Sequence, residues 1–583
     1  MTIIKLIGFQ GEVPRIVSRL LPEAAAASAV NARLETGSLT PYRKPKFVAR
    51  QSQFAAGTVK TIYRDLARNW LVWDKQVYVT PGPVAADRLY YMGDGAPKMR
   101  VAGVTYPLAL PFPATKPTAT PSGAGSGDIF TRVYVYTYVS VFDEETEPSA
   151  ASSAINWQAG QTVTLTNLSL PPNGTRINRM RIYRSQTSLS GTDLYFIAEI
   201  AASTTTFVDN VPLNQQNEPI PSLDWNAPPD GLTGLIALSN GMMAAFRGKE
   251  LWFCEPWRPH AWPESYMLTM AYDIVGLGAF GTTIVVATKG QPYMVNGTSP
   301  DAMAEEKIEL NLPCINPRGI VDLGYAIAYP STDGLAVISS AGARVVTDNL
   351  MTRNQWLRTA PDRFVACQFF GRYFASYEYV DPDGRALVGS FIIDLTGQEA
   401  FMHRVSTKAD ATWYDLATGT MYLCMGTDIY EWDSIEAPSD ILVWKSKQFV
   451  VARPTNFGAI LIEGSTLVSA EEDAAVSAAI QAAITYNASI YARPSIGGEM
   501  NGSAFNDFPI DGDMMMVIPT ADRYVSVAIY ADGKLVATVD RLNRMARLPG
   551  GFLARTWEIE VSTNADIAQV TLAGTGAELA GAQ

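Results

Sequence analysis

Two histidines, His260 and His403, are the only ones in the chain and lie 143 positions apart. A Ser–His–Asp triad needs a histidine base and a carboxylate that orients it, and a histidine zinc site needs ligands at short, paired spacing. His260 instead lies in an aromatic, proline-rich loop, Trp257–Pro263, with no G-x-S-x-G motif near it. We therefore predict a packed loop histidine and no catalytic or metal-binding residue.

The segment Gly276–Gly281 matches the G-x-G-x-x-G pattern of dinucleotide-binding loops. That pattern functions where a helix begins at the third glycine, so that its N-terminus faces the pyrophosphate. Residues 282–288 are mostly β-branched and predict a strand instead, so no cofactor is expected. Ser331–Gly334 is similar to the Asp-box turn of sialidase propellers, but the threonine and tryptophan that complete that motif do not follow.

Carboxylate and aromatic side chains could form other kinds of functional site. Glycoside hydrolysis needs two carboxyl groups that flank the scissile bond, and nothing in the sequence selects a pair among 57 acidic residues. The spacing of Asp507, Asp511 and Asp513 does not fit an EF-hand calcium loop. Three tryptophans of one segment could stack on sugar rings or pack between sheets: Trp252, Trp257 and Trp262.

Composition restricts the class of protein further. The chain has 583 residues, of which 47% are apolar and 17% are charged, below the ~25% charged residues of typical proteins. We infer that much of its surface is buried against partner subunits. The net charge of −12 argues against a nucleic-acid clamp, which would be basic. An acidic wall would still let DNA slide past, because phosphates gain no counterion release there.

Cysteine usage and the N-terminus bear on the cellular compartment. The four cysteines form no C-x-x-C pair, which predicts reduced, mostly buried thiols: Cys254, Cys314, Cys367 and Cys424. The start, Met1–Ile7, is too short for a signal peptide, and no apolar run approaches the ~18 residues of a membrane span. The protein is therefore expected to be made in a cytoplasm and to have no membrane span.

Glycine-centred turns, each followed by an alternating apolar strand, recur at steps of 42, 44, 50 and 35 residues: Gly248, Gly290, Gly334, Gly384 and Gly419. A weaker copy at Val77–Val79 precedes them. A period of ~40–50 residues with several strands and no helix in each unit is typical of β-propeller blades. The repeat by itself assigns no function.

The sequence predicts a mainly β protein with five parts: an N-terminal arm with a short helix (1–50), a first β region that is part of the propeller or platform (51–115), proline- and glycine-rich linkers around a β-sandwich (116–227), β-propeller blades (228–445) and a C-terminal β-rich platform domain containing one helix (446–583). The first helix is predicted over Pro22–Ala29 because alanine has the highest helix propensity. The second begins at the capping box Ser469–Glu472. The runs Tyr134–Ser140 and Asp143–Ser149 resemble the fibronectin type III module.

With these parts in this order, the chain resembles the tail hub or nozzle (tail tubular-type) proteins of tailed, chiefly short-tailed, bacteriophages. The N-terminal likeness lies in Gly11–Arg15, Leu20–Pro22, Ala29–Asn31 and Gly37–Arg43. The middle likeness is the module Tyr134–Asp209, and the C-terminal likeness lies in Arg547–Phe552, Trp557–Ile559 and Gly574–Leu579.

The resemblance implies a structural protein of the virion tail, made in the host cytoplasm. In that family six copies form a ring below the adaptor ring, the genome is ejected through the central channel without sequence-specific DNA binding, and the propellers carry tail fibres or spikes. The family supplies no catalytic residues. A polysaccharide-degrading propeller enzyme and a carbohydrate-binding adhesin are the alternatives.

The family resemblance and the basic N-terminal arm suggest candidate assembly contacts. We expect the arm to bridge to a neighbouring subunit or to the adaptor, and the wall of the channel to be net acidic. The residues of the two terminal motifs that are selected as contacts are Pro14, Arg15, Asn31, Pro41, Arg43, Arg547, Leu548 and Pro549.

Overall fold

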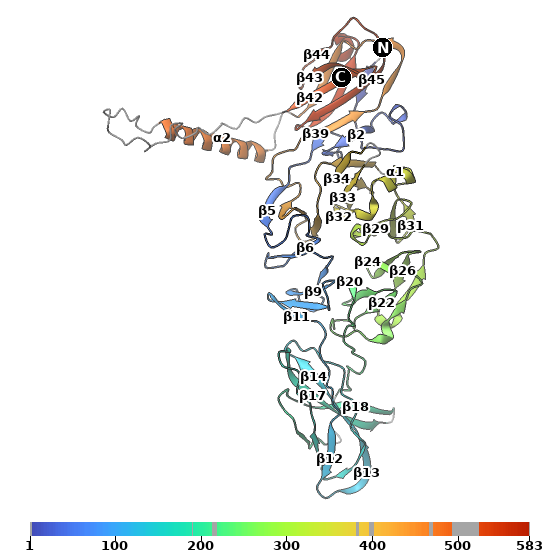
Figure 1. The fold of residues 1–583 in the computed structure, drawn as a ribbon, viewed down its shortest axis with the longest axis vertical. Helices are drawn as coiled ribbons and strands as arrows, with labels where there is room; N and C mark the ends of the chain where they lie inside the picture. The colour runs from blue at the N-terminus through green and yellow to red at the C-terminus, as the bar shows by residue number, and fades with distance from the viewer. Residues whose placement is uncertain are drawn as a thin grey trace, which may run out of the picture. The chain divides into compact units, whose positions relative to one another are not determined.

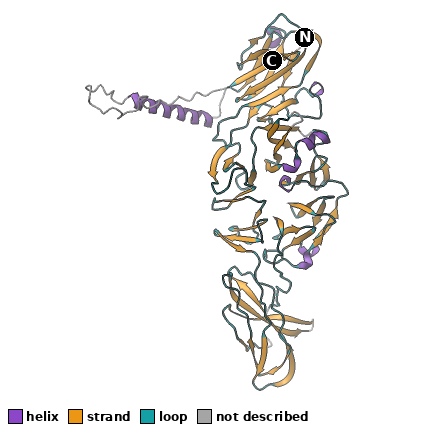
Figure 2. Cartoon of the chain, viewed as in Figure 1, coloured by secondary structure: helices purple, strands orange, loops and turns teal. Residues whose placement is uncertain are grey.

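The computed structural model describes residues 3–188, 191–212, 218–380, 384–395, 401–465, 470–491 and 524–581. The protein is mainly β, with 49% strand and 7% helix, as the sequence predicts (Figures 1 and 2). It divides into a terminal unit, Met1–Gly57 with Val346–Gln583, and a central unit, Thr58–Val345. This division falls at 345, whereas the sequence predicts a boundary at 445.

The central unit contains four antiparallel sheets, each a meander of four consecutive strands. They are β8 (Tyr78–Pro81), β9 (Arg88–Met92), β10 (Lys98–Val101) and β11 (Val104–Pro107); β20 (Thr233–Ala237), β21 (Met243–Arg247), β22 (Glu250–Phe253) and β23 (Leu268–Thr269); β24 (Ile274–Phe280), β25 (Thr283–Thr288), β26 (Tyr293–Asn296) and β27 (Ala304–Lys307); and β28 (Val321–Asp322), β29 (Ala326–Pro330), β30 (Leu335–Ser339) and β31 (Gly342–Val345). A further pair joins β6 (Thr61–Arg64) to β7 (Trp70–Trp73).

These sheets share cores with their neighbours in chain order. In β25, Ile284 and Val286 belong to a core shared with the β20–β23 sheet, whereas Val285 and Ala287 belong to a core shared with the β28–β31 sheet. Successive side chains of a strand point to opposite faces, so the apolar run of β25 is buried on both sides. Another core joins the β8–β11 sheet to the β20–β23 sheet.

The predicted hairpins are confirmed. Gly248 lies between β21 and β22, Gly290 between β25 and β26, and Gly334 between β29 and β30. In the terminal unit, Gly384 and Gly419 lie in the turns that follow β33 and β36. Gly248 and Gly419 have φ values of 60° and 67°, a region that glycine enters without the steric cost of a Cβ.

A β-sandwich is inserted in the chain between β11 and β20. Its strands are β12 (Thr118–Ser122), β16 (Thr162–Thr166) and β19 (Phe207–Asp209); β14 (Tyr134–Ser140), β17 (Ile177–Ser188) and β18 (Gly191–Ala201); and the pair β13 (Ser126–Arg132) and β15 (Ile155–Ala159). The two three-stranded sheets enclose one core, to which Tyr136 and Ile182 contribute from one sheet and Val163 and Leu165 from the other.

Part of the segment predicted as a flexible linker is strand. Thr118–Ser122 form β12, and β13 begins at Ser126, so the linker prediction is wrong for residues 118–122 and 126–127. Pro121 is tolerated because β12 is the edge of its sheet, where a proline removes no hydrogen bond from a central ladder.

The terminal unit is built on a ten-stranded sheet. Its strands, in spatial order, are β32 (Val365–Phe369), β33 (Arg372–Val380), β34 (Ala386–Asp394), β35 (Phe401–Val405), β2 (Ala26–Val30), β39 (Leu442–Ser446), β45 (Ala554–Thr563), β42 (Val525–Ala531) and β43 (Lys534–Val539), with β40 (Phe449–Thr455) paired to β45. A second sheet orders β1 (Ile3–Leu6), β46 (Ile567–Ala573), β41 (Ala459–Gly464) and β44 (Ala546–Arg547). A third orders β36 (Ala411–Asp415), β37 (Thr420–Met425), β38 (Asp428–Glu431) and β5 (Lys46–Arg50), and β3 (Ala32–Arg33) pairs with β4 (Thr40–Pro41).

The predicted helix in the N-terminal arm is wrong. Ala26–Val30 form β2, and the arm's helical turn is a single 3-10 turn at Ser18–Leu20. Strand β2 lies between β35 and β39, and its Ala26 and Ala29 are buried in the main core of the unit. The helix propensity of alanine is worth only fractions of a kcal/mol per residue, so ladder hydrogen bonds and burial override it.

The arm is also not a free extension. β1 pairs with β46, β2 lies within the ten-stranded sheet, and β5 completes the sheet of β36–β38. These pairings contradict the prediction that residues 1–50 form an arm that extends from the fold. The same strands that the sequence describes as an arm complete sheets whose other strands come from residues 365–573.

Three α-helices occur among the described residues, and all belong to the terminal unit. α1 (Arg353–Arg358) begins with a capping box in which Thr352 and Gln355 exchange hydrogen bonds. α2 (Ala470–Tyr491) is the helix predicted after Ser469, a residue outside the described part of the chain. α3 (Gly576–Ala580) is a second helix of the C-terminal region; it is too short for a 3.6-residue periodicity to reveal it.

Candidate functional site

His260 is packed in the interior of the central unit. Its side chain is buried, its Nε2 lies 2.9 Å from the backbone oxygen of Glu145, and its ring meets that of Trp225 edge to face. Burial lowers the pKa of His260 to about 4, so the ring is neutral near pH 7. A catalytic base would need a carboxylate to orient it, and the neighbour here is a backbone carbonyl. The prediction of a packed loop histidine is confirmed.

His403 lies on β35 in the core of the terminal unit. Its Nε2 is 2.9 Å from the hydroxyl of Tyr42, and the two rings stack with centroids 5.6 Å apart. Burial lowers the pKa of His403 to about 3. The His403–Tyr42 pair joins β35 to the segment after β4 and therefore has a structural role.

The two buried histidines predict a loss of stability on mild acidification. Their folded pKa values lie below the unfolded value of ~6.5, so the unfolded chain binds more protons below that pH. The stability that they contribute is complete above about pH 6.5 and falls as the pH decreases, by up to ~1.4 kcal/mol per pH unit for each histidine. Urea unfolding from pH 7 to pH 5 measures this slope.

A substitution at His403 tests whether the buried histidines cause this pH dependence of the stability. His403→Gln is expected to remove most of the pH dependence between 6.5 and 5 from the unfolding of the terminal unit, because glutamine does not titrate, and to leave that of the central unit, which contains His260, unchanged. Few carboxylates with ordinary pKa values of ~4 take up protons in this window. An unchanged slope in His403→Gln would contradict the interpretation.

The remaining sequence motifs also have packing roles. Gly276 and Gly278 lie in β24, where an added Cβ would meet Ile320 and Ile327 at 2.4 and 2.7 Å, so glycine permits close packing of neighbouring sheets. The expected strand after the G-x-G-x-x-G pattern is confirmed as β25. All four cysteines are buried free thiols, and burial raises their pKa values to about 12.

A buried cluster of charges joins strands β13, β14, β17 and β19 of the sandwich. Asp209 accepts hydrogen bonds from the Tyr134 hydroxyl at 2.7 Å and from Arg184 Nη1 at 3.0 Å. Arg132 Nη1 lies 3.5 Å from the same carboxylate, and its guanidinium stacks 3.4 Å from the centroid of the Trp157 ring. Burial lowers the pKa of Arg132. One carboxylate therefore compensates two buried arginines.

A second buried cluster surrounds Glu145, which is almost inaccessible. Its carboxylate pairs with Arg181 at 2.7 Å and accepts hydrogen bonds from three hydroxyl groups, those of Tyr183 at 2.6 Å, Thr137 at 2.8 Å and Ser222 at 3.3 Å. Its backbone oxygen contacts His260, which lies between β22 and β23. This cluster fixes the sandwich to the neighbouring sheet, and its carboxylate is fully engaged by internal donors.

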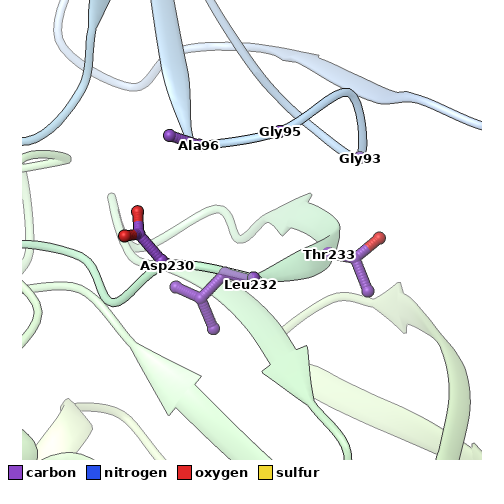
Figure 3. Close-up of a pocket in the computed structure, with 7 residues that line it drawn as sticks. Gly93, Gly95, Ala96, Asp230, Leu232 and Thr233 are labelled. Carbon is purple, nitrogen blue, oxygen red and sulfur yellow. The ribbon is translucent and has the colours of Figure 1, made fainter.

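A hollow of about 500 Å³ lies in the central unit between the β9–β10 turn and the segment that enters β20 (Figure 3). Its lining is mostly backbone and small side chains: Gly93, Gly95, Ala96, Asp230, Gly231, Leu232 and Thr233. Asp230 is the single carboxylate among these seven residues. Hydrolysis of a glycosidic bond needs two, so the lining lacks the pair that the enzyme alternative requires.

The N-terminal candidate contacts divide into buried and accessible residues. Asn31 and Pro41 are buried; the Asn31 amide donates to Ser406 Oγ, Asp440 Oδ2 and the Ile441 carbonyl. Pro14 accepts a hydrogen bond from Gln355, Arg15 is exposed and bonds to Asp348, and Arg43 Nη1 donates to the carbonyls of Ile435 and Ala437.

The C-terminal candidates behave in the same way. Leu548 is buried and its amide donates to the Gly458 carbonyl at 2.9 Å. Arg547 and Pro549 are exposed on and beside β44. Arg15, Arg547 and Pro549 are therefore the candidates whose side chains are exposed to a partner.

The three tryptophans considered for stacking have different environments. Trp252 and Trp262 are buried in a core of the central unit, whereas Trp257 is 52% exposed. Trp257 also has a φ of 62°. Nothing in the sequence separates these three residues, because exposure and backbone conformation depend on how the loop folds.

Within the described ranges, no group of three or more metal-ligating side chains comes together. The helices described there include none that is long and apolar enough to cross a membrane. Asp507, Asp511 and Asp513 lie outside the described residues.

Comparisons with known proteins find no matching family model and no matching curated protein. Among solved structures, the chain is similar to the WD40 domain of Neurospora crassa Pan2, at 9% identity over 66% of this chain and 91% of that chain, with a TM-score of 0.27. It is also similar to the extracellular domain of a putative one-component system from B. thetaiotaomicron, at 8% identity over 76% and 74%, with a TM-score of 0.19. Neither likeness is close enough to assign a function.

Proposed function

We propose that this chain is a structural subunit of a bacteriophage tail, a nozzle or hub protein that assembles below the adaptor as a ring, of six copies as the family resemblance implies. The genome would leave through the ring, and fibres or spikes would attach to it. The small meander sheets would be blades of a β-propeller, and the inserted sandwich a fibronectin type III-like module. The chain would act by shape and assembly and would catalyse no reaction.

The proposal rests on the positions in the fold of the N-terminal and C-terminal motifs that carry the family resemblance. Leu39, from an N-terminal motif, and Ile567, which lies between the C-terminal motifs Trp557–Ile559 and Gly574–Leu579, exchange backbone hydrogen bonds of 2.8 and 2.9 Å. β1 pairs with β46 beside them. The two ends thus form one folded body, as a ring-forming platform made from both termini requires.

The stacked sheets and the charge distribution give further support. Four-stranded antiparallel sheets that share a core with the next sheet along the chain are the repeating element of a propeller. The buried carboxylates of the sandwich are paired with arginines, which suits a rigid module. The net charge of −12 suits a channel that does not hold DNA.

Light scattering and negative-stain electron microscopy of the purified chain test the proposal. The expected particle is a ring with about six times the chain mass of 63.3 kDa, formed alone or on addition of an adaptor ring. Arg547→Glu, at an exposed candidate contact, is expected to weaken assembly. Lys249→Glu, at an exposed hairpin turn of the central unit, is the control. A monomer under both conditions would overturn the proposal, as would turnover of a polysaccharide by the purified chain.

A further inference from the structure

The backbone of Trp257 adopts an unfavourable conformation. Its φ of 62° is left-handed, a region that bulky residues with a Cβ rarely occupy. Such strain persists only where the surrounding structure imposes it, and it concentrates at functional sites. The residue is nevertheless 52% exposed, so burial does not explain why a tryptophan occupies this position.

The loop around Trp257 is firmly braced. The Trp257 amide donates to the Gly241 carbonyl at 2.9 Å, and Glu255 and Ala261 are joined by a hydrogen bond of the same length. Beneath the loop, the buried Trp262 donates its Nε1 proton to the Pro259 carbonyl at 2.8 Å. The backbone that carries the Trp257 ring is therefore held by hydrogen bonds before any ligand arrives.

One face of the indole lies against the backbone of Gly241. A Cβ placed on Gly241 would lie between 2.5 and 2.8 Å from three atoms of the Trp257 ring. The ring thus lies flat on the glycine backbone and presents a face, rather than an edge that could insert into a pocket of a partner protein.

Two exposed polar residues are neighbours of Trp257 and Gly241 in the chain, Arg258 and Ser239. Arg258 is exposed, and its guanidinium lies 5.6 Å from the centroid of the Trp225 ring, which orders the side chain while its N–H groups remain donors. Ser239, in the turn that contains Gly241, is exposed as well. A flat apolar platform with hydroxyl and guanidinium groups beside it matches a pyranose ring, which has an apolar C–H face and a rim of hydroxyls.

We propose that Trp257 is the stacking platform of a carbohydrate-binding site that takes one pyranose ring of a glycan chain. Arg258 and Ser239 would hydrogen-bond to the sugar hydroxyls. A nucleobase would fit the same face, but the chain has a net charge of −12 and lacks the basic surface that binding of phosphates requires. The site is independent of ring assembly, so it goes beyond the proposed function.

Saturation-transfer NMR on the full-length protein tests this site. The probes are cellohexaose, maltohexaose and chitohexaose, each measured separately, with decaproline as a peptide that also stacks on tryptophan. At least one sugar is expected to bind with a Kd of about 1 mM or tighter, a normal range for a single weak contact. Decaproline is expected to give no signal.

Two variants locate the site without relying on a loss of folding. Trp257→Gly removes the ring and relieves the strain, because glycine accepts a positive φ; it is expected to abolish sugar binding with an unchanged or higher unfolding temperature. Gly241→Ala keeps the tryptophan but displaces its ring, and is expected to weaken binding at least 10-fold.

A matched control is available in the terminal unit. Phe370 is 60% exposed and has a φ of 49°, so Phe370→Ala removes an equally strained, exposed aromatic ring and is expected to leave sugar binding unchanged. Absence of binding by all three sugars would overturn the proposal. So would binding that survives Trp257→Gly, or capture of decaproline in place of the sugars, which would assign the platform to a peptide.

Discussion

Deletion of residues 2–30 is expected to unfold the terminal unit. The deletion removes β1 from its pairing with β46 and removes β2 from the interior of the ten-stranded sheet. It also removes Ile4, Leu6 and Phe9 from the main core. The lost burial and ladder hydrogen bonds are comparable with the whole stability of a typical domain, about 5–15 kcal/mol.

Calorimetry and limited proteolysis measure this outcome. The unfolding transition of the terminal unit should disappear, and a protected fragment that spans residues 58–345 should remain. Leu20→Ser changes a residue of the same segment that is 72% exposed, and should leave both readouts unchanged. A deletion variant with two intact transitions would show that the arm is dispensable for folding.

Asp209→Ala is expected to destabilise the sandwich by about 3–5 kcal/mol, the cost of leaving a buried charge without its partner. The substitution removes the carboxylate that compensates Arg132 and Arg184, whose side chains are 3% and 2% exposed. It also leaves the Tyr134 hydroxyl without its acceptor. Hydrogen exchange of the β14 amides in the full-length chain measures the change, because this strand is buried along its length.

Glu199→Ala is the matched control for this substitution. Glu199 also pairs with two arginines, Arg179 at 3.0 Å and Arg181 at 2.9 Å, but its side chain is 32% exposed. Solvent screens such pairs, so the expected loss is about 1 kcal/mol or less. Equal losses in the two variants would contradict the interpretation that the Asp209 carboxylate compensates two buried arginines.

Local patterns in the sequence predicted the hairpins correctly. A turn at Gly248 or Gly419, followed by an alternating apolar strand, is determined by residues within a few positions of the glycine. Such turns form in most contexts. The strand after Gly281 was predictable for the same reason. The packed environment of His260 followed from its aromatic, proline-rich surroundings.

Two segments were predicted incorrectly because distant residues decide their structure. The alanines of Ala26–Val30 favour a helix locally, but β39 is more than 400 residues away in the chain and supplies the ladder that makes them a strand. Thr118–Ser122 contain a proline and look like a linker, yet the edge of the β12–β16 sheet accommodates Pro121. The sequence alone does not show which strands will lie beside these segments.

Some conclusions about the candidate site residues also followed from local sequence, and others required the tertiary structure. Residue types alone were enough to argue against a histidine base and a nucleotide loop, and to place the chain in a β-rich, repeat-containing class. The choice of Trp257 over Trp262 as an accessible ring, and of Arg547 over Asn31 as an accessible contact, depends on burial. Burial is a property of the packed chain and cannot be predicted from the sequence motif.

The amino-acid pattern by itself determined the β-rich class, the hairpin repeat and the acidic, weakly charged character of this protein, because periodicity, turn chemistry and charge are local or additive. Only the tertiary structure decided that the N-terminal segment completes sheets of the C-terminal region, and that the indole ring of the exposed Trp257 rests on Gly241. Those features arise from pairing between residues far apart in the chain, whose free energy exceeds the small local preferences that a sequence displays.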